Sequence, residues 1–260
     1  MRLGLHLGLG SNVAASGGGA AATWQPSSLG SALFGDYDGR KTSTIDTSIS
    51  NVWTPFAGTG GILTQATAAN RGTYSSGPPP GLVYDTTDEL VIPSAPATNW
   101  DAIALVTTNA SSASYRTLLW NLSGTHSLCL ETGTNRLGTF SAGSFHDSAL
   151  TVATATTAIV HVRMTDNGGG AGLVSMSVNG NTRTGTIDTI AVGDTTPTRL
   201  GNASGGSQAF GTIHRLVVTN SLLSTTSGAE LDKVIGGMAW DASLQSLLPV
   251  GHPYKSAAPT

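Results

Sequence analysis

Charged side chains are scarce in this chain of 260 residues: they make up 10% of it, and the net charge is only −3. Disordered chains combine high net charge with few apolar residues, whereas 39% of this chain is hydrophobic. Nucleic-acid-binding proteins carry a basic patch, for which this composition gives no sign. We therefore expect a folded protein with a sizeable core and no nucleic-acid partner.

Cysteine is rare, and long apolar runs are missing. The single cysteine, Cys129, excludes a disulfide within the chain, and its neighbours Leu128 and Leu130 predict a buried structural thiol. No apolar run is long enough to span a bilayer, so we expect no membrane partner.

Short alternating apolar stretches, separated by Gly, Ser and Thr, fill the chain instead. Val160, Val162 and Met164 would share one face of a strand, and the residues at 174, 176 and 178 repeat this pattern. Asn179-Gly180 follows, and both residues tolerate the positive φ angles of a tight hairpin turn. Strands at such short spacing predict a β-sandwich.

The stretch from Phe210 to Lys255 predicts a buried strand and then a helix. Residues 211–219 contain three consecutive apolar residues, so both faces of this strand should be covered. Ser227 and Glu230 have the spacing of a capping box, and apolar residues at helical spacing follow them. The sequence predicts one short helix beginning at Ser227.

This stretch resembles the end of laminin-G/concanavalin-A-like domains in structural proteins of tailed phages and prophages. The residues that carry the likeness are Phe210-Gly211-x-Ile213, Ala239-Trp240 and Leu248-Pro249-x-Gly251-His252-Pro253-Tyr254-Lys255. The family's opening strand is similar to Ala32-Leu33-Phe34-x-Asp36-x-x-Asp38, and its next segment to residues 65–74. Two departures are Phe34 in place of a family tryptophan, and Thr54 to Gly58 in place of an Asp-x-Ser-Gly loop.

The resemblance implies an all-β, concanavalin-A-like (laminin-G) jelly-roll β-sandwich with one short C-terminal helix and an N-terminal arm. We place the arm at residues 1–23 and the sandwich with its helix and tail at residues 24–260. The arm alternates with period two, as a strand donated to a partner would, through Leu3, Leu5, Leu7 and Leu9. A flexible tail and a signal peptide are the alternatives for this segment.

No catalytic or metal-binding residue emerges from the sequence. A glycosidase needs two carboxylates that flank one bond, but the three glutamates, Glu89, Glu131 and Glu230, lie far apart. The histidines are scattered singly without zinc-ligand spacing, namely His126, His146, His161 and His214. We expect no cofactor; calcium at Asp85 and Asp88 is a weak alternative to a plain turn.

Glycan binding stays open, because a sugar site needs an exposed aromatic platform with polar neighbours. Trp53, Tyr74 and Trp100 lie near predicted loops and are the candidates, whereas Trp120 and Trp240 fit apolar core patterns.

The resemblance implies a non-enzymatic structural component of a phage or phage-like particle. A head decoration, a head fibre and a tail fibre all fit, located at the virion surface. Its partners would be other virion proteins, further copies of itself and host surface polysaccharide. The alternatives are a secreted carbohydrate-binding module and, second, a glycan-cleaving enzyme.

Overall fold

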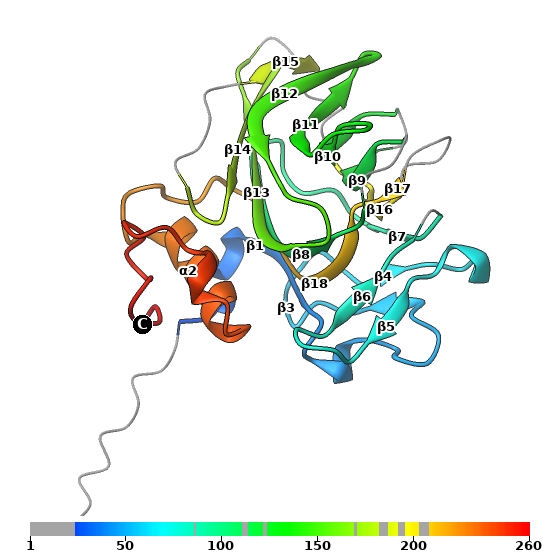
Figure 1. Ribbon diagram of the computed structural model, residues 1–260, viewed down its shortest axis with the longest axis horizontal. Coiled ribbons are helices and arrows are strands. Elements are labelled where there is room, and N and C mark those ends of the chain that lie inside the picture. Colours follow the sequence, from blue (N-terminus) through cyan, green and yellow to red (C-terminus); the bar gives the residue numbers. More distant parts are fainter. Residues whose placement is uncertain are drawn as a thin grey trace, which may run out of the picture.

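The computed structural model of the protein describes residues 24–85, 87–110, 114–121, 124–168, 171–181, 187–191, 196–202 and 208–260. Within them, two mainly antiparallel sheets form a sandwich, and a helix lies outside one sheet (Figure 1). The predicted jelly-roll sandwich with one short C-terminal helix is therefore confirmed. The arm, residues 1–23 with Leu3, Leu5, Leu7 and Leu9, lies outside the described residues and stays a prediction.

The first sheet is built around β8, which pairs with β13 on one side and β18 on the other. Its path is β15 (Ile187–Ala191), β14 (Ala171–Val178), β13 (Thr157–Asp166), β8 (Trp100–Thr108), β18 (Gly211–Thr219), β1 (Leu33–Asp38) and β3 (Ala57–Gly58). At one end of β18, β6 (Gly81–Val83) pairs with it and also with β5 (Thr73–Ser75).

The second sheet contains shorter strands with several register shifts. Its path is β12 (Ser144–Thr151), β11 (Arg136–Ser141), β10 (His126–Leu130), β9 (Arg116–Trp120), β16 (Arg199–Gly201), β7 (Glu89–Val91), β4 (Leu63–Thr64) and β2 (Val52–Trp53). The short β17 (Gln208–Ala209) runs parallel to β9. Four short 3₁₀ segments are described: η1 (Pro26–Ala32) before β1, η2 (Thr42–Thr44) and η3 (Ala68–Asn70) between strands, and η4 (Gln245–Leu247) after the helix.

The core lies between the sheets and follows the predicted alternation. Val162 pairs with Met176 across β13 and β14, and both side chains are fully buried. Asn179 and Gly180 have φ angles of 56° and 74°, as the predicted tight hairpin turn requires. After this turn the next described strand is β15, which begins at Ile187, and residues 182–186 lie outside the described residues.

A second, smaller hydrophobic core covers the outer face of the first sheet. Helix α2 (Glu230–Asp241) packs across β8 and β13 with its residues Leu231, Val234, Ile235 and Met238. Their i, i+3, i+4, i+7 spacing gives the helix one apolar face. Val217 of β18 belongs to this outer core, while its neighbours Leu216 and Val218 belong to the inner one, so both faces of that strand are covered as predicted.

The helix begins differently from the prediction. Ala229 is the N-cap and makes no side-chain cap, so the Ser227–Glu230 capping box is wrong. Instead, Glu230 accepts a hydrogen bond from the backbone N–H of Ser224, and Asp232 accepts one from that of Gly228. These carboxylates lie in the first helical turn, where negative charge is favourable.

The C-terminal tail is fastened to α2 rather than free. The Trp240 indole donates to the Tyr254 carbonyl (2.8 Å), and the Tyr254 hydroxyl donates to the Gly228 carbonyl (2.7 Å). A Cβ on Gly236 would lie 2.7 Å from the Tyr254 side chain, so the close approach of tail and helix requires glycine there. Lys255 donates from Nζ to three carbonyls, those of residues 245, 246 and 248.

Candidate functional site

Two of the three predicted glycan-binding residues are in the core. Trp53 and Trp100 are 0% exposed, so neither can offer a ring to a ligand, and their prediction as site residues is wrong. Trp53 packs edge-on against Tyr37, with ring centroids 6.0 Å apart. Trp100 begins β8 and points inward in the same alternation as Ala102 and Ala104.

Tyr74 is the predicted residue that lies near the surface. It is half-buried and packs partly against the core, and its hydroxyl donates weakly to the Gly39 carbonyl (3.4 Å). With Arg71 and Ser48 it lines a shallow pocket of about 310 Å³. The Arg71 guanidinium donates to the carbonyls of residues 65 and 66, so it braces the adjoining loop.

A cluster of aromatic rings lies on the outer face of the second sheet, where the sequence analysis placed no site. We call Tyr115, His126, Phe140 and Phe145 the aromatic face. The Tyr115 ring centroid is 4.9 Å from that of Phe140 and 6.0 Å from that of Phe145, and His126 lies 5.3 Å from Phe140. Tyr115, Phe140 and Phe145 are half-buried, which leaves part of each ring accessible.

Strand register puts these side chains on one face. His126 is opposite Phe140 across β10 and β11, and Phe140 is opposite Phe145 across β11 and β12, and opposed residues share a face of a sheet. Leu137 points into the core, and Phe140, three residues further along β11, points to the other side. The rings therefore face away from the sandwich interior.

An ion-pair network borders the aromatic face. Arg136 donates to Glu131 (2.6 Å) and to Asp147 (2.7 Å), and its guanidinium lies 5.9 Å from the Phe145 ring centroid. The Arg136 side chain is 46% exposed, so these charges can reach a ligand on the rings. Apolar rings beside fixed hydrogen-bonding groups are typical of sites that take a partly polar ligand such as a sugar.

His126 is the buried member of the cluster. Burial lowers its pKa to about 4, so the ring is neutral at pH 7. Its Nδ1 lies 3.0 Å from the hydroxyl of Thr117 on β9. His126 therefore supports the exposed rings as an uncharged packing partner.

One local signal could have revealed part of this face. Phe140 and Phe145 flank a four-residue turn in which Ala142 and Gly143 have φ angles of 50° and 80°. Glycine and small residues between two phenylalanines predict a hairpin that brings the two rings together. His126 joins them through strand pairing and Tyr115 through the start of β9, and the sequence displays neither relation.

The three glutamates stay apart, as the sequence analysis expected. Glu131 holds Arg136, Glu230 accepts the Ser224 N–H, and Glu89 lies 3.8 Å from Arg199. Burial raises the pKa of Glu89, and it raises that of its neighbour Asp88 to about 6. Successive residues of an extended chain point to opposite sides, so these two carboxyl groups do not flank one bond.

A histidine–carboxylate pair does occur, but it is sealed inside the fold. His161 Nε2 lies 2.7 Å from Asp101, and both side chains are at most 1% exposed. The same carboxylate accepts two hydrogen bonds from Arg163 and one from the Leu223 backbone N–H. All of these contacts are structural, and no ligand can reach the pair.

Asp85 and Asp88, the residues of the calcium alternative, both accept backbone hydrogen bonds within their own loop. The Asp88 carboxylate accepts the backbone N–H of Asp85 (2.9 Å), and Asp85 accepts that of Thr87. Among the described residues, no group of three or more His, Cys, Asp or Glu side chains is arranged to hold a metal ion. The described helices likewise include none with the length and apolar character of a membrane span.

Comparisons with known proteins relate the chain to others by fold. No protein-family model matches it, and neither does any curated protein. Among solved structures, a Trypanosoma rangeli sialidase matches 79% of this chain at 16% identity with a TM-score of 0.52. The match takes in 34% of the sialidase chain, so this protein spans about a third of its length.

A smaller neighbour is similar over nearly its whole length. Domain 4 of AbnA, an extracellular arabinanase from Geobacillus stearothermophilus, in complex with arabinotriose, matches at 15% identity and a TM-score of 0.49. The match covers 74% of this chain and 94% of that domain. At this identity, the comparisons identify a shared β-sandwich fold.

Proposed function

We propose that the protein is a non-catalytic structural component of a phage or phage-like particle that contacts host surface polysaccharide through the aromatic face. The observation that carries the glycan contact is the open cluster of Tyr115, Phe140 and Phe145 beside Arg136. The C–H faces of a sugar can pack on these rings while its hydroxyls bond the charged groups at their edge. The similar sialidases include one in complex with sialic acid, which supports a fold suited to sugar ligands.

The state of the nearby carboxylates supports binding without catalysis. A glycosidase needs one carboxyl group to donate a proton and a second to act as base or nucleophile. Glu131 and Asp147 both accept hydrogen bonds from the Arg136 guanidinium, so neither is a free carboxyl group poised for proton transfer to a sugar. We therefore expect contact with a polysaccharide and no cleavage.

The virion location rests on the likeness of the C-terminal motif to phage structural proteins. In that setting the arm, with Leu3, Leu5, Leu7 and Leu9, docks onto a neighbouring subunit or another virion protein. Burying each leucine would contribute about 1.5–3 kcal/mol. A particle displays many copies, so weak individual sugar contacts add up to firm attachment.

The test of glycan contact uses the full chain and immobilised capsular polysaccharide or lipopolysaccharide. We expect weak, reversible binding that Phe145→Ala reduces about five- to tenfold, since an aromatic contact is worth about 1 kcal/mol. Phe56→Ala is the matched control, because Phe56 is 50% exposed and lies near Lys41, away from the aromatic face. Equal loss in both variants, or release of reducing ends from the polysaccharide, would contradict the proposal.

The test of the virion role is deletion of residues 2–22. We expect a folded domain that no longer joins particles, because the anchor is gone while residues 24–260 keep both cores. Incorporation at normal copy number would place the anchor elsewhere, and secretion of the protein without particles would favour the carbohydrate-binding module.

A further inference from the structure

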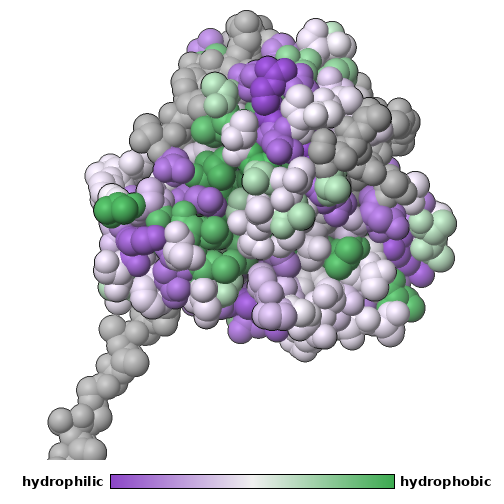
Figure 2. All heavy atoms as spheres, viewed as in Figure 1, coloured by the Kyte–Doolittle hydropathy of each residue, from purple (hydrophilic) through white to green (hydrophobic). Residues whose placement is uncertain are grey.

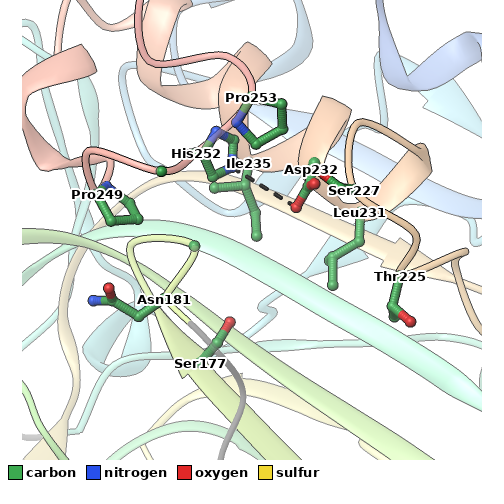
Figure 3. A pocket seen from close by; sticks show the side chains of 12 residues that line it. Ser177, Asn181, Thr225, Ser227, Leu231, Asp232, Ile235, Pro249, His252 and Pro253 are labelled. Carbon is green, nitrogen blue, oxygen red and sulfur yellow. Dashed lines mark ion pairs between the residues drawn. The ribbon is translucent and has the colours of Figure 1, made fainter.

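A second pocket opens between α2, the β14 hairpin turn and the C-terminal tail. None of its lining residues belongs to the aromatic face. The pocket measures about 450 Å³, within the range of small-molecule sites. Figure 3 shows His252 and Pro253 of the tail facing Asp232 of α2, with Asn181 of the turn on the other side. The apolar part of the lining comes from Leu231, Ile235, Pro249 and Pro253.

His252 carries the argument, because its polar atoms are almost all used within the chain. Its Nδ1 accepts the backbone N–H of Tyr254 (3.2 Å), its own backbone N–H donates to the carbonyl of residue 249, and its carbonyl accepts the N–H of Lys255. Nε2 is the exception: it is buried and has no hydrogen-bond partner within the described part of the chain. The His252 side chain is only 1% exposed, so this atom is shielded from open solvent, and His252 is one of the residues that line the pocket.

The tautomer of His252 follows from these contacts. Since Nδ1 accepts a hydrogen bond, the proton of the neutral ring lies on Nε2, which is then a donor. Burial lowers the pKa of His252, and the nearby Lys255 acts in the same direction, while Asp232 opposes them. The ring is therefore neutral at pH 7 and carries one N–H, on Nε2, that has no acceptor among the described residues.

Asp232 supplies the complementary acceptor. Its Oδ2 accepts the Gly228 backbone N–H (2.8 Å), and its Oδ1 lies 3.8 Å from His252 Nε2. This separation is too long for a direct hydrogen bond but leaves a donor and an acceptor side by side. A hydroxyl group, or two neighbouring hydroxyl groups, can accept from Nε2 and donate to Oδ1 at the same time.

The charge of the lining selects among hydroxylated ligands. Asp232 is the one acidic or basic side chain among the described lining residues other than His252. Lys255, whose charge acts on His252, is not a lining residue, and its Nζ is directed at the carbonyls of residues 245, 246 and 248. An anionic ligand would be repelled, whereas a neutral one would not.

We propose that this pocket binds a neutral sugar residue, with its vicinal hydroxyls on His252 Nε2 and Asp232 Oδ1 and its C–H face on the prolines and Ile235. The hydroxyls of Thr225 and Ser227 and the Asn181 side chain lie at the same lining and can take further sugar hydroxyls. The inference goes beyond the contact at the aromatic face and rests on different residues.

The experiment is saturation-transfer NMR on the full chain with four neutral probes: the methyl glycosides of glucose, galactose, mannose and rhamnose. Glucuronic acid is the anionic comparison. We expect signal transfer from at least one neutral glycoside and none from glucuronic acid. No transfer from any neutral glycoside would mean that the pocket holds only water, and stronger transfer from glucuronic acid would overturn the charge argument.

Three variants test whether the glycoside binds in this pocket. Ser227→Trp fills the mouth of the pocket from an exposed position and should abolish the transfer, while Ser224→Trp, exposed on the same segment but outside the lining, should preserve it. Asp232→Asn keeps an acceptor for the Gly228 N–H and should weaken binding about tenfold, because it replaces a charged acceptor. Unchanged transfer in Ser227→Trp would overturn the assignment.

These tests can contradict the proposal for either site without contradicting the proposal for the other. Loss of polysaccharide binding in Phe145→Ala with intact glycoside transfer would leave the pocket standing, and the reverse outcome would leave the aromatic face standing. Signal transfer that Phe145→Ala abolishes and Ser227→Trp spares would assign the glycoside to the aromatic face and overturn the pocket.

Discussion

The outer faces of the two sheets hold their charged side chains in opposite environments. On the first sheet, Asp36, Asp101 and Arg215 are at most 3% exposed, beneath α2 and the segment that leads to it. On the second sheet, Arg136 is 46% exposed and lies beside open aromatic rings. Figure 2 shows the side that carries α2, where apolar surface gathers next to the helix.

Burial and pairing separate structural charges from charges that can meet a ligand. Arg215 makes two hydrogen bonds of 2.8 Å to Asp36 and a third to Asp241 at the end of α2, so it ties the helix to the sheet. A buried charge is tolerated only when paired, and breaking the pair is costly. Arg136 has equally short contacts in water, where such pairs contribute little to stability and remain available to partners.

The largest expected effect comes from the core that both sheets share. Met176→Asp should unfold the domain, because the new carboxylate would be buried without a partner, a change that exceeds about 5 kcal/mol. Met176 is 0% exposed and faces Val162. Circular dichroism and thermal melting check this, with Ser175→Asp as the control, since Ser175 points to the other side of β14 and is half-buried. A stable Met176→Asp protein would contradict the assigned face.

The next effect addresses the first sheet's outer face. Arg215→Ala leaves the Asp36 carboxylate buried without its guanidinium and should lower the free energy of unfolding by about 3–5 kcal/mol. Urea denaturation measures the change. The double variant Arg215→Met with Asp36→Leu removes both charges and should recover a large part of the loss. If the double variant is less stable than Arg215→Ala, the Arg215–Asp36 pair stabilises the fold by more than the neutralisation of two buried charges.

A pH effect should distinguish the buried member of the aromatic face. Burial depresses the pKa of His126 to about 4, below the value of about 6.5 in an unfolded chain. Its contribution to stability is therefore present above pH 6.5 and is lost as the pH falls toward 4, by up to about 3 kcal/mol. His126→Gln cannot titrate, so its free energy of unfolding should fall less over this window than that of the wild type. If the free energies of unfolding of the two proteins fall equally between pH 6.5 and pH 4, His126 is not desolvated in the folded protein.

The sequence predicts the fold well because the fold depends on local alternation. The two matching strands at residues 157–178, the Asn179-Gly180 turn and the apolar spacing of α2 are each visible within a few residues. Trp100 was misplaced although the same reasoning applies to it: its side chain continues the inward alternation of Ala102 and Ala104. Its position at the start of β8 suggested a loop instead.

The functional surfaces depend on contacts between distant residues. Arg215 meets Asp36 from 179 residues away, and His126 meets Phe140 only through a strand pairing with a register shift. The pocket joins the β14 turn to a tail some 70 residues later. Sequence patterns do not show which distant segments come into contact. They could place His252 in a turn, but they could not place its Nε2 beside Asp232.

The smallest expected effect on stability belongs to Arg136, and it makes the comparison with Arg215 direct. Arg136→Gln removes hydrogen bonds to Glu131 and Asp147 that are as short as those of Arg215, yet it should leave the free energy of unfolding almost unchanged. The reason is solvent: the two carboxylates regain water when the guanidinium is lost, whereas Asp36 cannot. The same substitution should weaken polysaccharide binding, because it removes a charged donor from the edge of the rings. Urea denaturation and binding assays on one preparation separate the two readouts. A loss of stability as large as that of Arg215→Ala would show that the Arg136 network is structural and would remove it from the binding surface.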